Sequence, residues 1–227
     1  MSTTPDDAAT DLLIREVDED LRHDRMHAVW RQYGSLFFAA AISVVVAVAA
    51  WQAWQNWQMR QRLASSDKFV AALSLVDAGR KEDALKQLGT LSLDGTPGYR
   101  LLAKLEEAEV LLGTGDVKGT LAVYQLIIND TGVDQIYRDM ARLKAAYISL
   151  DSGDPAVIDH QVEPLIQDAN PWRFEAREIQ ALNAIKRGET TRAVEVYKAL
   201  ADDSAAPQAI RARAAEMLKI LQPKSNG

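Results

Sequence analysis

The stretch Gly34–Trp51, GSLFFAAAISVVVAVAAW, contains eighteen residues without a charge or a proline. As an α-helix rising about 1.5 Å per residue it would be roughly 27 Å long, close to the ~30 Å hydrocarbon core of a bilayer. Aromatic residues flank this stretch on both sides: Trp30 and Tyr33 at one end, and Trp51, Trp54 and Trp57 at the other. Amphipathic rings in these places are typical of membrane interfaces. We therefore predict a transmembrane helix over residues 34–57.

A buried core helix and a cleaved signal peptide are both less consistent with the composition of this stretch. A buried core helix would have to be apolar on every face in a chain whose other segments have the pattern of amphipathic helices. A cleaved signal peptide has an apolar core of only ~7–15 residues, although Ala47-Val48-Ala49 does mimic a cleavage site. We therefore expect an uncleaved anchor. The residues that represent this predicted span are Gly34, Phe37, Phe38, Ile42, Val45, Val48, Trp51 and Trp54.

The 33 residues before the span form an acidic tail, with eight acids and four arginines. Leu13, Val17 and Leu21 recur at helical spacing after Thr10, a plausible N-cap, which predicts a short amphipathic helix in residues 1–33. Four bases precede the span, and Arg60, Arg62 and Lys68 follow it closely. This small difference is only a weak indication of a cytoplasmic N-terminus.

The composition of the remaining chain excludes several classes of function. Without the tail, 22 of the 26 bases and 24 of the 32 acids remain, so there is no basic surplus to attract nucleic acid. The sequence contains no cysteine, which excludes disulfides, thiolate metal sites and a cysteine nucleophile. Strand-like alternation is absent after the span, and we expect an all-α protein.

Four glycines lie between apolar helical patterns at nearly constant spacing. Gly79, Gly115, Gly153 and Gly188 are separated by 36, 38 and 35 residues. Three other positions keep the same register, with a small residue seven before the glycine, a position five after it that is usually small and a large apolar residue nine after it. These positions are occupied by Ala72, Ala108, Ala146 and Ala181; by Ala84, Thr120, Ile158 and Ala193; and by Leu88, Tyr124, Val162 and Tyr197. Thr120 and Ile158 depart from the small residue expected at the second of these positions.

This pattern resembles a degenerate tetratricopeptide repeat, whose period is ~34 residues. One helical hairpin cannot bury its apolar face alone, but stacked hairpins bury a continuous core with an atypical cap at the end. We predict a tetratricopeptide-repeat-like α-solenoid over residues 60–227, with hairpins at about 63–93, 98–130, 134–168 and 170–203. A capping helix would follow at Pro207–Leu221. The alternative is a generic helical bundle with accidental spacing.

No catalytic motif is recognisable in the chain. It has no phosphate-binding glycine loop, no HExxH and no Ser/His/Asp arrangement. His160 lies near Asp159 and Glu163, but a single histidine flanked by acids on a helix is more often solvated than a metal ligand. We therefore expect no enzyme activity, no cofactor, no metal and no small-molecule substrate.

An aromatic residue followed by arginine opens the first helix of each later repeat, always at the same distance before the turn glycine. A further base lies four residues beyond each arginine. The members of this aromatic and basic edge are Tyr99, Arg100 and Lys104; Tyr137, Arg138 and Arg142; and Trp172, Arg173 and Arg177.

The aromatic and basic edge has two interpretations. Bases near a helix N-terminus oppose the macrodipole, so local helix stability does not explain them, and they would form a docking edge for an acidic or extended polypeptide. Alternatively, the aromatics staple neighbouring hairpins and the bases pair with Glu106, Asp139, Glu175 and Glu178.

Several segments together resemble the YfgM-like ancillary SecYEG translocon subunits in their alphaproteobacterial form. The resemblance covers nearly the whole chain. Its most distinctive parts are REVDEDLR (residues 15–22) and PWR (residues 171–173), which lies within the NPWRFEAREIQAL segment that begins at Asn170. The other segments are WRQYG at residues 30–34, the span, GYRLLAKLEEAEVLL from Gly98, RGE at residues 187–189 and PQAIRARAAEML from Pro207.

The resemblance implies a single-pass protein of the bacterial inner membrane, with a cytoplasmic N-terminus and a periplasmic repeat domain. Its implied partners are the Sec translocon and periplasmic chaperones that meet emerging polypeptides, and it supplies no catalytic residues. The expected function is thus a membrane-anchored protein-binding scaffold. Two alternatives stay open: a structural subunit of another membrane complex that binds through tail and span, and a coordinator of envelope assembly or cell division.

Overall fold

The computed structural model describes the backbone of residues 5–222, and the side chains of residues 30–222 except Ser152. All regular elements in this part of the chain are helices, with no strand, which confirms the all-α prediction. The chain divides into two compact units, Met1–Arg60 and Gln61–Gly227.

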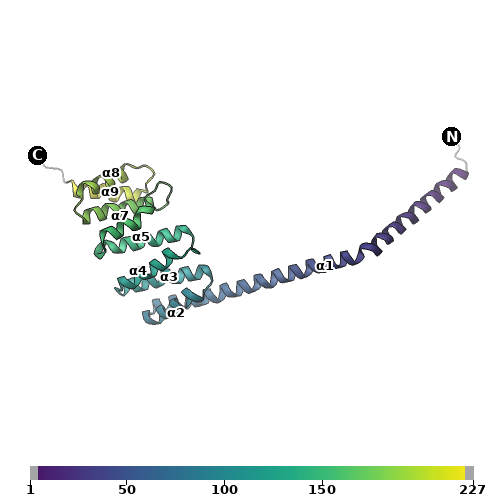
Figure 1. Ribbon diagram of the computed structural model, residues 1–227, viewed down its shortest axis with the longest axis horizontal. Helices are drawn as coiled ribbons and strands as arrows, with labels where there is room; N and C mark the ends of the chain where they lie inside the picture. Colours follow the sequence, from purple (N-terminus) through teal and green to yellow (C-terminus); the bar gives the residue numbers. More distant parts are fainter. Residues whose placement is uncertain (1–4, 223–227) are drawn as a thin grey trace. The chain divides into compact units, whose positions relative to one another are not determined.

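Figure 1 shows the helices in chain order, from α1 to α9. They are α1 (Pro5–Asp77), α2 (Lys81–Asp94), α3 (Pro97–Gly113), α4 (Val117–Asn129), α5 (Gln135–Ser152), α6 (Pro155–Val162), the short 3-10 helix η1 (Glu163–Leu165), α7 (Arg173–Lys186), α8 (Thr190–Asp202) and α9 (Gln208–Leu221).

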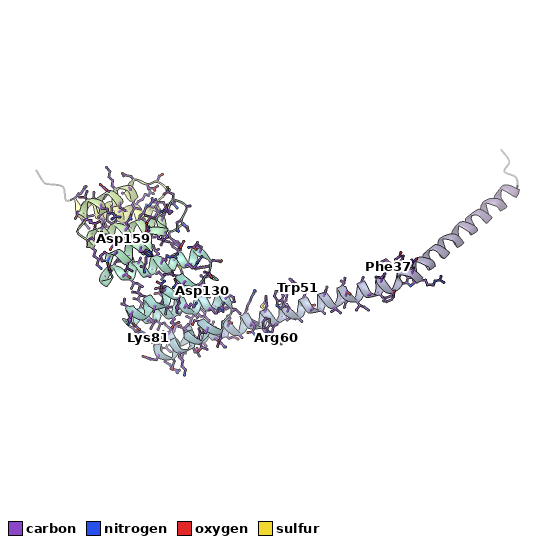
Figure 2. The ribbon with its side chains drawn as sticks, viewed as in Figure 1. Phe37, Trp51, Arg60, Lys81, Asp130 and Asp159 are labelled. Atoms are coloured by element: carbon purple, nitrogen blue, oxygen red, sulfur yellow. The ribbon has the colours of Figure 1, made fainter. Side chains whose placement is uncertain are left out.

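The first unit consists of helix α1 up to Arg60, and its apolar side chains are exposed. Figure 2 shows the labelled Phe37 and Trp51 projecting outward from the helix. Phe37, Val45 and Trp51 are 61%, 66% and 60% exposed. Gly34 is buried because the Trp30 ring covers it. The most apolar window of eighteen residues has a mean hydropathy of 2.1, and only 6% of it is buried.

Exposing so many apolar side chains to water is unfavourable, and α1 is long and apolar enough to cross a bilayer. The helix is therefore a candidate membrane span. Helix α1 begins at Pro5, so the tail is helical from that residue onward. The side chains of the predicted amphipathic segment, residues 10–28, lie outside the described side chains.

In the second unit each helix packs against the next one along the chain, from α2 to α9. The end of α1 joins this stack through Phe69 and Ala72, which belong to the same apolar cluster as Leu88 of α2 and Tyr99 of α3. The observed pairs α1–α2, α3–α4, α5–α6 and α7–α8 match the predicted hairpin ranges, and α9 matches the predicted cap.

The repeat register is borne out by burial. Every residue at the three aligned positions is 0–1% exposed: Ala72, Ala108, Ala146, Ala181, Ala84, Thr120, Ile158, Ala193, Leu88, Tyr124, Val162 and Tyr197. Small residues let the helices of a hairpin approach, and the large residues fill the space between hairpins. Thr120 satisfies its buried hydroxyl by donating to the Asp116 carbonyl at 2.8 Å.

All four turn glycines lie between the two helices of a hairpin. Gly79, Gly115 and Gly188 have φ values of +73°, +82° and +76°, a left-handed conformation that glycine adopts without strain. In each case the N–H after the glycine donates to a carbonyl five residues earlier, as from Arg80 to Leu75 at 2.9 Å. This closure of the helix end is that of a Schellman motif.

Gly153 serves the same turn by a different route. Its φ is −77° and ψ is 163°, an extended conformation. The next residue, Asp154, precedes Pro155 and is therefore also extended, and its side chain caps α6 by accepting from the Ala156 N–H. A Cβ on Gly153 would lie only 2.6 Å from the Ser149 carbonyl oxygen, so glycine is required here by close approach.

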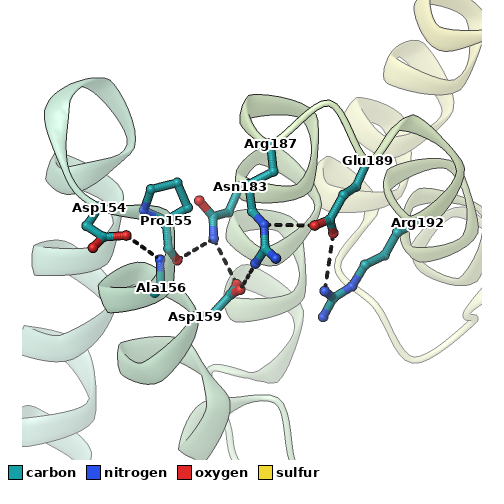
Figure 3. Close-up of polar contacts among 8 residues, drawn as sticks. All are labelled: Asp154, Pro155, Ala156, Asp159, Asn183, Arg187, Glu189 and Arg192. Atoms are coloured by element: carbon teal, nitrogen blue, oxygen red, sulfur yellow. Dashed lines mark hydrogen bonds and ion pairs between the residues drawn. The ribbon is translucent and has the colours of Figure 1, made fainter.

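A polar network joins the third and fourth hairpins, as Figure 3 shows. The fully buried Asn183 of α7 donates to the Pro155 carbonyl and to the Asp159 carboxylate, both at 2.8 Å. Arg187 donates to the same carboxylate at 2.6 Å and also pairs with Glu189 at 2.8 Å. The acid next to His160 is thus held by side chains of the following hairpin.

Candidate functional site

Two of the three aromatic members of the predicted edge connect neighbouring hairpins. The Tyr99 ring packs against Phe69, with ring centroids 6.0 Å apart. The Trp172 indole N–H donates to the Ile136 carbonyl of the preceding hairpin at 3.2 Å. Tyr137 is 44% exposed. The stapling interpretation therefore describes the contacts of Tyr99 and Trp172.

Several bases of the edge are held by acids, but mostly not by the predicted ones. Lys104 pairs with Asp130 at 3.2 Å, and Arg177 pairs with Asp168 at 2.6 Å. The pKa of Asp130 is lowered first by the Gly132 N–H and then by Lys104. These pairs join helices or loops of the same or adjacent hairpins.

Of the predicted acid partners, Asp139 is the one that pairs with a base of the edge. This buried carboxylate accepts from Arg142 at 2.9 Å, from Gln135 at 2.7 Å and from Asn170 at 3.0 Å. Because Asn170 precedes α7, the network ties the third hairpin to the fourth. Its role is structural.

The three remaining bases of the edge differ in their surroundings. Arg173 lies over the Phe174 ring, 4.1 Å from its centroid, and Arg138 donates to Gln135. Arg100 is exposed. Most residues of the edge thus form contacts within the protein, while Arg100 and Tyr137 are exposed to solvent. Docking of a polypeptide on this edge stays a prediction.

A different surface, a groove of about 820 Å³, lies on the first helices of the later repeats and on the cap. Its lining is mostly apolar and comes mainly from α3, α5, α7 and α9. The lining residues are Glu109, Leu112, Tyr124, Leu143, Lys144, Tyr147, Ile148, Glu175, Glu178, Ile179, Leu182, Tyr197, Arg213, Glu216, Met217 and Ile220. Tyr147 and Ile220 are each 64% exposed.

This groove was not predicted from the sequence, although the repeat register contains a signal for it. Glu109, Tyr147 and Leu182 lie six residues before their turn glycines, next to the buried small residue of each repeat. Equivalent positions of stacked repeats form a column along one face. The column of residues six positions before the turn glycines, next to the buried column seven positions before them, therefore lines the groove.

Ion pairs between alternate helices cross the groove at two places. Lys144 of α5 pairs with Glu109 of α3, and Arg213 of α9 donates to both carboxylate oxygens of Glu178 of α7, at 2.8 and 2.7 Å. The hydrogen bond from Lys144 lowers the pKa of Glu109, and the bond to Glu178 raises the pKa of Arg213. Each pair links first helices of successive hairpins or the cap.

Two tyrosines at the equivalent repeat position differ in their partners. The Tyr124 hydroxyl donates to Glu109 at 3.1 Å, and burial, followed by the charge of Glu109, raises its pKa. The Tyr197 hydroxyl is buried and has no hydrogen-bond partner within residues 30–222. Burial raises the pKa of Tyr197 to about 12. One oxygen of Glu175 is likewise buried without a partner among the described side chains.

The groove has the chemistry of a binding surface. Within the described residues no cluster of three or more histidines and acids is suited to hold a metal ion. Exposed apolar and aromatic side chains with a few polar groups are typical of sites that bind another polypeptide.

The comparison with known families agrees with this architecture. Residues 27–177 match a family described as a tetratricopeptide repeat-like domain, and the match covers more than half of the chain. The chain belongs to this tetratricopeptide repeat-like family. No curated protein and no solved structure matches the chain.

The tetratricopeptide repeat-like match begins before Trp30 and ends at Arg177 within α7. It therefore includes the apolar part of α1 and the first three hairpins. Repeat proteins of this kind typically present concave surfaces to protein partners and are not catalytic. Helices α8 and α9, which contribute Tyr197 and Arg213 to the groove, lie beyond the match.

Proposed function

We propose that the protein is a membrane-anchored scaffold that binds other polypeptides in the groove of its repeat domain. The observation that carries this proposal is the groove itself, a mostly apolar surface built mainly from the first helices of three repeats and the capping helix. Helix α1 supplies the anchor. A tethered binding domain meets its membrane partners at high effective concentration, so that moderate affinity is sufficient.

We further propose that the partners are the Sec translocon and the periplasmic chaperones or emerging polypeptides beside it. The resemblance to the YfgM-like ancillary SecYEG subunits supports this assignment. The N-terminus would then be cytoplasmic, residues 34–57 would span the inner membrane and residues 60–227 would be periplasmic.

The proposal is tested by truncating the two most exposed apolar residues of the groove. Tyr147→Ala with Ile220→Ala removes groove surface without touching the core, since both side chains are 64% exposed. After mild crosslinking in native membranes, we expect translocon components to be strongly depleted from the purified variant. Quantitative mass spectrometry supplies the measurement.

A matched control removes equally exposed apolar groups away from the groove. Leu93→Ala with Leu126→Ala changes side chains that are 75% and 60% exposed. This control should co-purify the same partners as the unchanged protein. Equal recovery with the groove variant and with the control would contradict binding in the groove.

Deleting residues 1–33 separates the scaffold from the structural-subunit alternative. A scaffold that binds through the groove keeps its partners after this deletion, provided that the span still inserts. Loss of the partners from the deletion variant, with full recovery by the groove variant, would favour binding through tail and span.

Protease treatment of spheroplasts tests the proposed sidedness. A periplasmic repeat domain is digested as soon as the outer membrane is opened, whereas the tail is protected until lysis. Protection of the repeat domain in intact spheroplasts would contradict the proposed orientation.

A further inference from the structure

The charges that line the groove are unevenly distributed. Lys144 and Glu109 balance each other near α3 and α5. Near α7 and α9, Glu175, Glu178 and Glu216 face a single base, Arg213. The groove as a whole therefore has four acids and two bases, and its surplus of negative charge lies in its C-terminal half.

The one base in this half is already engaged. Arg213 donates two hydrogen bonds to Glu178, which is the bidentate geometry of a strong arginine–carboxylate pair. Glu175 lies close enough to contribute to the raised pKa of Arg213, but it forms no hydrogen bond with it. Two carboxylates, Glu175 and Glu216, thus have no basic partner within the part of the chain that the structure describes.

A second observation is independent of these acids. Tyr197 is 1% exposed and lines the same groove, yet its hydroxyl finds no partner among the described residues. The equivalent Tyr124 does have one, the Glu109 carboxylate. A buried hydroxyl or carboxylate oxygen that forms no hydrogen bond destabilises the free protein. A donor from a bound molecule would supply a hydrogen bond to each oxygen and so favour binding.

We propose that the C-terminal half of the groove takes a lysine or arginine side chain from a bound polypeptide segment that is otherwise apolar. The cationic group donates to Glu175 and to the Tyr197 hydroxyl, with Glu216 contributing at the exposed rim. Because these atoms are shielded in the free protein, binding moves the side chains that cover them. The apolar residues of the segment pack against Tyr147, Leu182 and Ile220.

This inference rests on the proposed binding of polypeptides in the groove and specifies the chemistry of the occupant. The proposed occupant of the groove carries a positive charge, whereas a segment that docks on the aromatic and basic edge would be acidic. The difference arises because most bases of that edge are engaged within the protein, whereas two acids of the groove have no basic partner within residues 30–222.

The test measures peptide binding to the full-length protein in lipid nanodiscs by fluorescence anisotropy, with empty nanodiscs as the blank. The probes are three labelled peptides of leucine, alanine and glutamine that differ only in the central residue, which is lysine, norleucine or glutamate. We expect the lysine peptide to bind about tenfold more tightly than the norleucine peptide, since charge-assisted hydrogen bonds are stronger than neutral ones.

Three variants locate the effect. Glu175→Gln should weaken the lysine peptide about tenfold and leave the norleucine peptide unchanged, and Tyr197→Phe should weaken the lysine peptide about threefold. Glu195→Gln is the control, because Glu195 lies exposed on α8 outside the groove lining. Its affinities should match those of the unchanged protein.

The outcomes separate this inference from the proposed function. Equal binding of the lysine and norleucine peptides, with both weakened by Tyr147→Ala and Ile220→Ala, would overturn the cation site and leave the groove as a polypeptide site. Preference for the glutamate peptide would overturn it as well. Failure of all three peptides to bind would count against the inference and against the groove together.

Discussion

Valines in two helical regions of this protein have opposite surroundings. Val45 in α1 is 66% exposed, whereas Val162 in α6 is fully buried. Residues 34–51 are apolar on every face, while the helices of the second unit confine apolar residues to the faces that pack together. The comparison shows that helix formation is common to both regions and that the surroundings of their apolar side chains are different. The first pattern is that of a candidate membrane span, and the second is that of helices packed around a core.

The largest expected effect comes from placing charge in the apolar region. Ile42→Arg with Val45→Arg should cost about 5 kcal/mol or more of insertion free energy, at ~2.5–3.5 kcal/mol per arginine near the centre of a span. The protein should then be extracted from membranes by alkaline carbonate. Leu93→Arg with Leu126→Arg, in exposed positions of the second unit, should leave it in the pellet. Retention of both variants would contradict a membrane span at α1.

The second effect concerns packing in the repeats. Leu88→Ala removes a fully buried side chain at an aligned position and should lower the free energy of unfolding by about 2–5 kcal/mol. Leu93→Ala, on the same helix, removes a side chain that is 75% exposed and should change it by less than about 0.5 kcal/mol. Thermal unfolding followed by circular dichroism of the full chain in detergent provides the comparison. Similar losses of unfolding free energy in Leu88→Ala and Leu93→Ala would show that the repeat register is misassigned.

A smaller effect distinguishes the two equivalent tyrosines. Tyr124→Phe removes the hydrogen bond to Glu109 and should destabilise the protein by about 1 kcal/mol. Tyr197→Phe removes a buried hydroxyl that has no partner among the described residues, so stability should stay unchanged or increase. Chemical denaturation of both variants is the measurement. A marked loss with Tyr197→Phe would indicate a structural partner for that hydroxyl.

The smallest effect is a pH dependence at the groove. The hydrogen bond from Lys144 holds the pKa of Glu109 below its usual 4.5, so the pair stabilises the folded state above that pH and is lost as the pH falls through the lowered pKa. Both side chains are nearly half exposed, and solvent screening limits the contribution to less than about 1 kcal/mol. Lys144→Met should reduce the loss of stability measured by denaturation between about pH 5 and pH 3. If Lys144→Met left the loss of stability between these pH values unchanged, other carboxylates would be its cause.

The helical repeats were predictable because each depends on local residue types at a fixed period. The aligned alanines, the turn glycines and the large residues nine positions later all occupy the expected places. Gly153 differs from the other three glycines in having an extended conformation, and Pro155 favours an extended conformation at the next residue, Asp154. That difference was also present in the sequence, as the pair Asp154-Pro155.

The polar part of the groove was not predictable from the repeat pattern. The pairs Glu109–Lys144 and Glu178–Arg213 join residues 35 positions apart on alternate helices. Which acid meets which base depends on the rotation of each helix in the stack, and the period alone does not determine it. For the same reason Glu178, expected beside the basic edge, instead faces the cap.

Photocrosslinking from the groove in native membranes tests most directly whether the groove binds polypeptides. A photoreactive amino acid at Tyr147, in the groove, is compared with the same amino acid at Leu126, which is similarly exposed on α4 outside the groove lining. We expect crosslinks to polypeptides from position 147 and few from position 126. Equal yields at the two positions, or crosslinks from position 126 alone, would contradict binding in the groove.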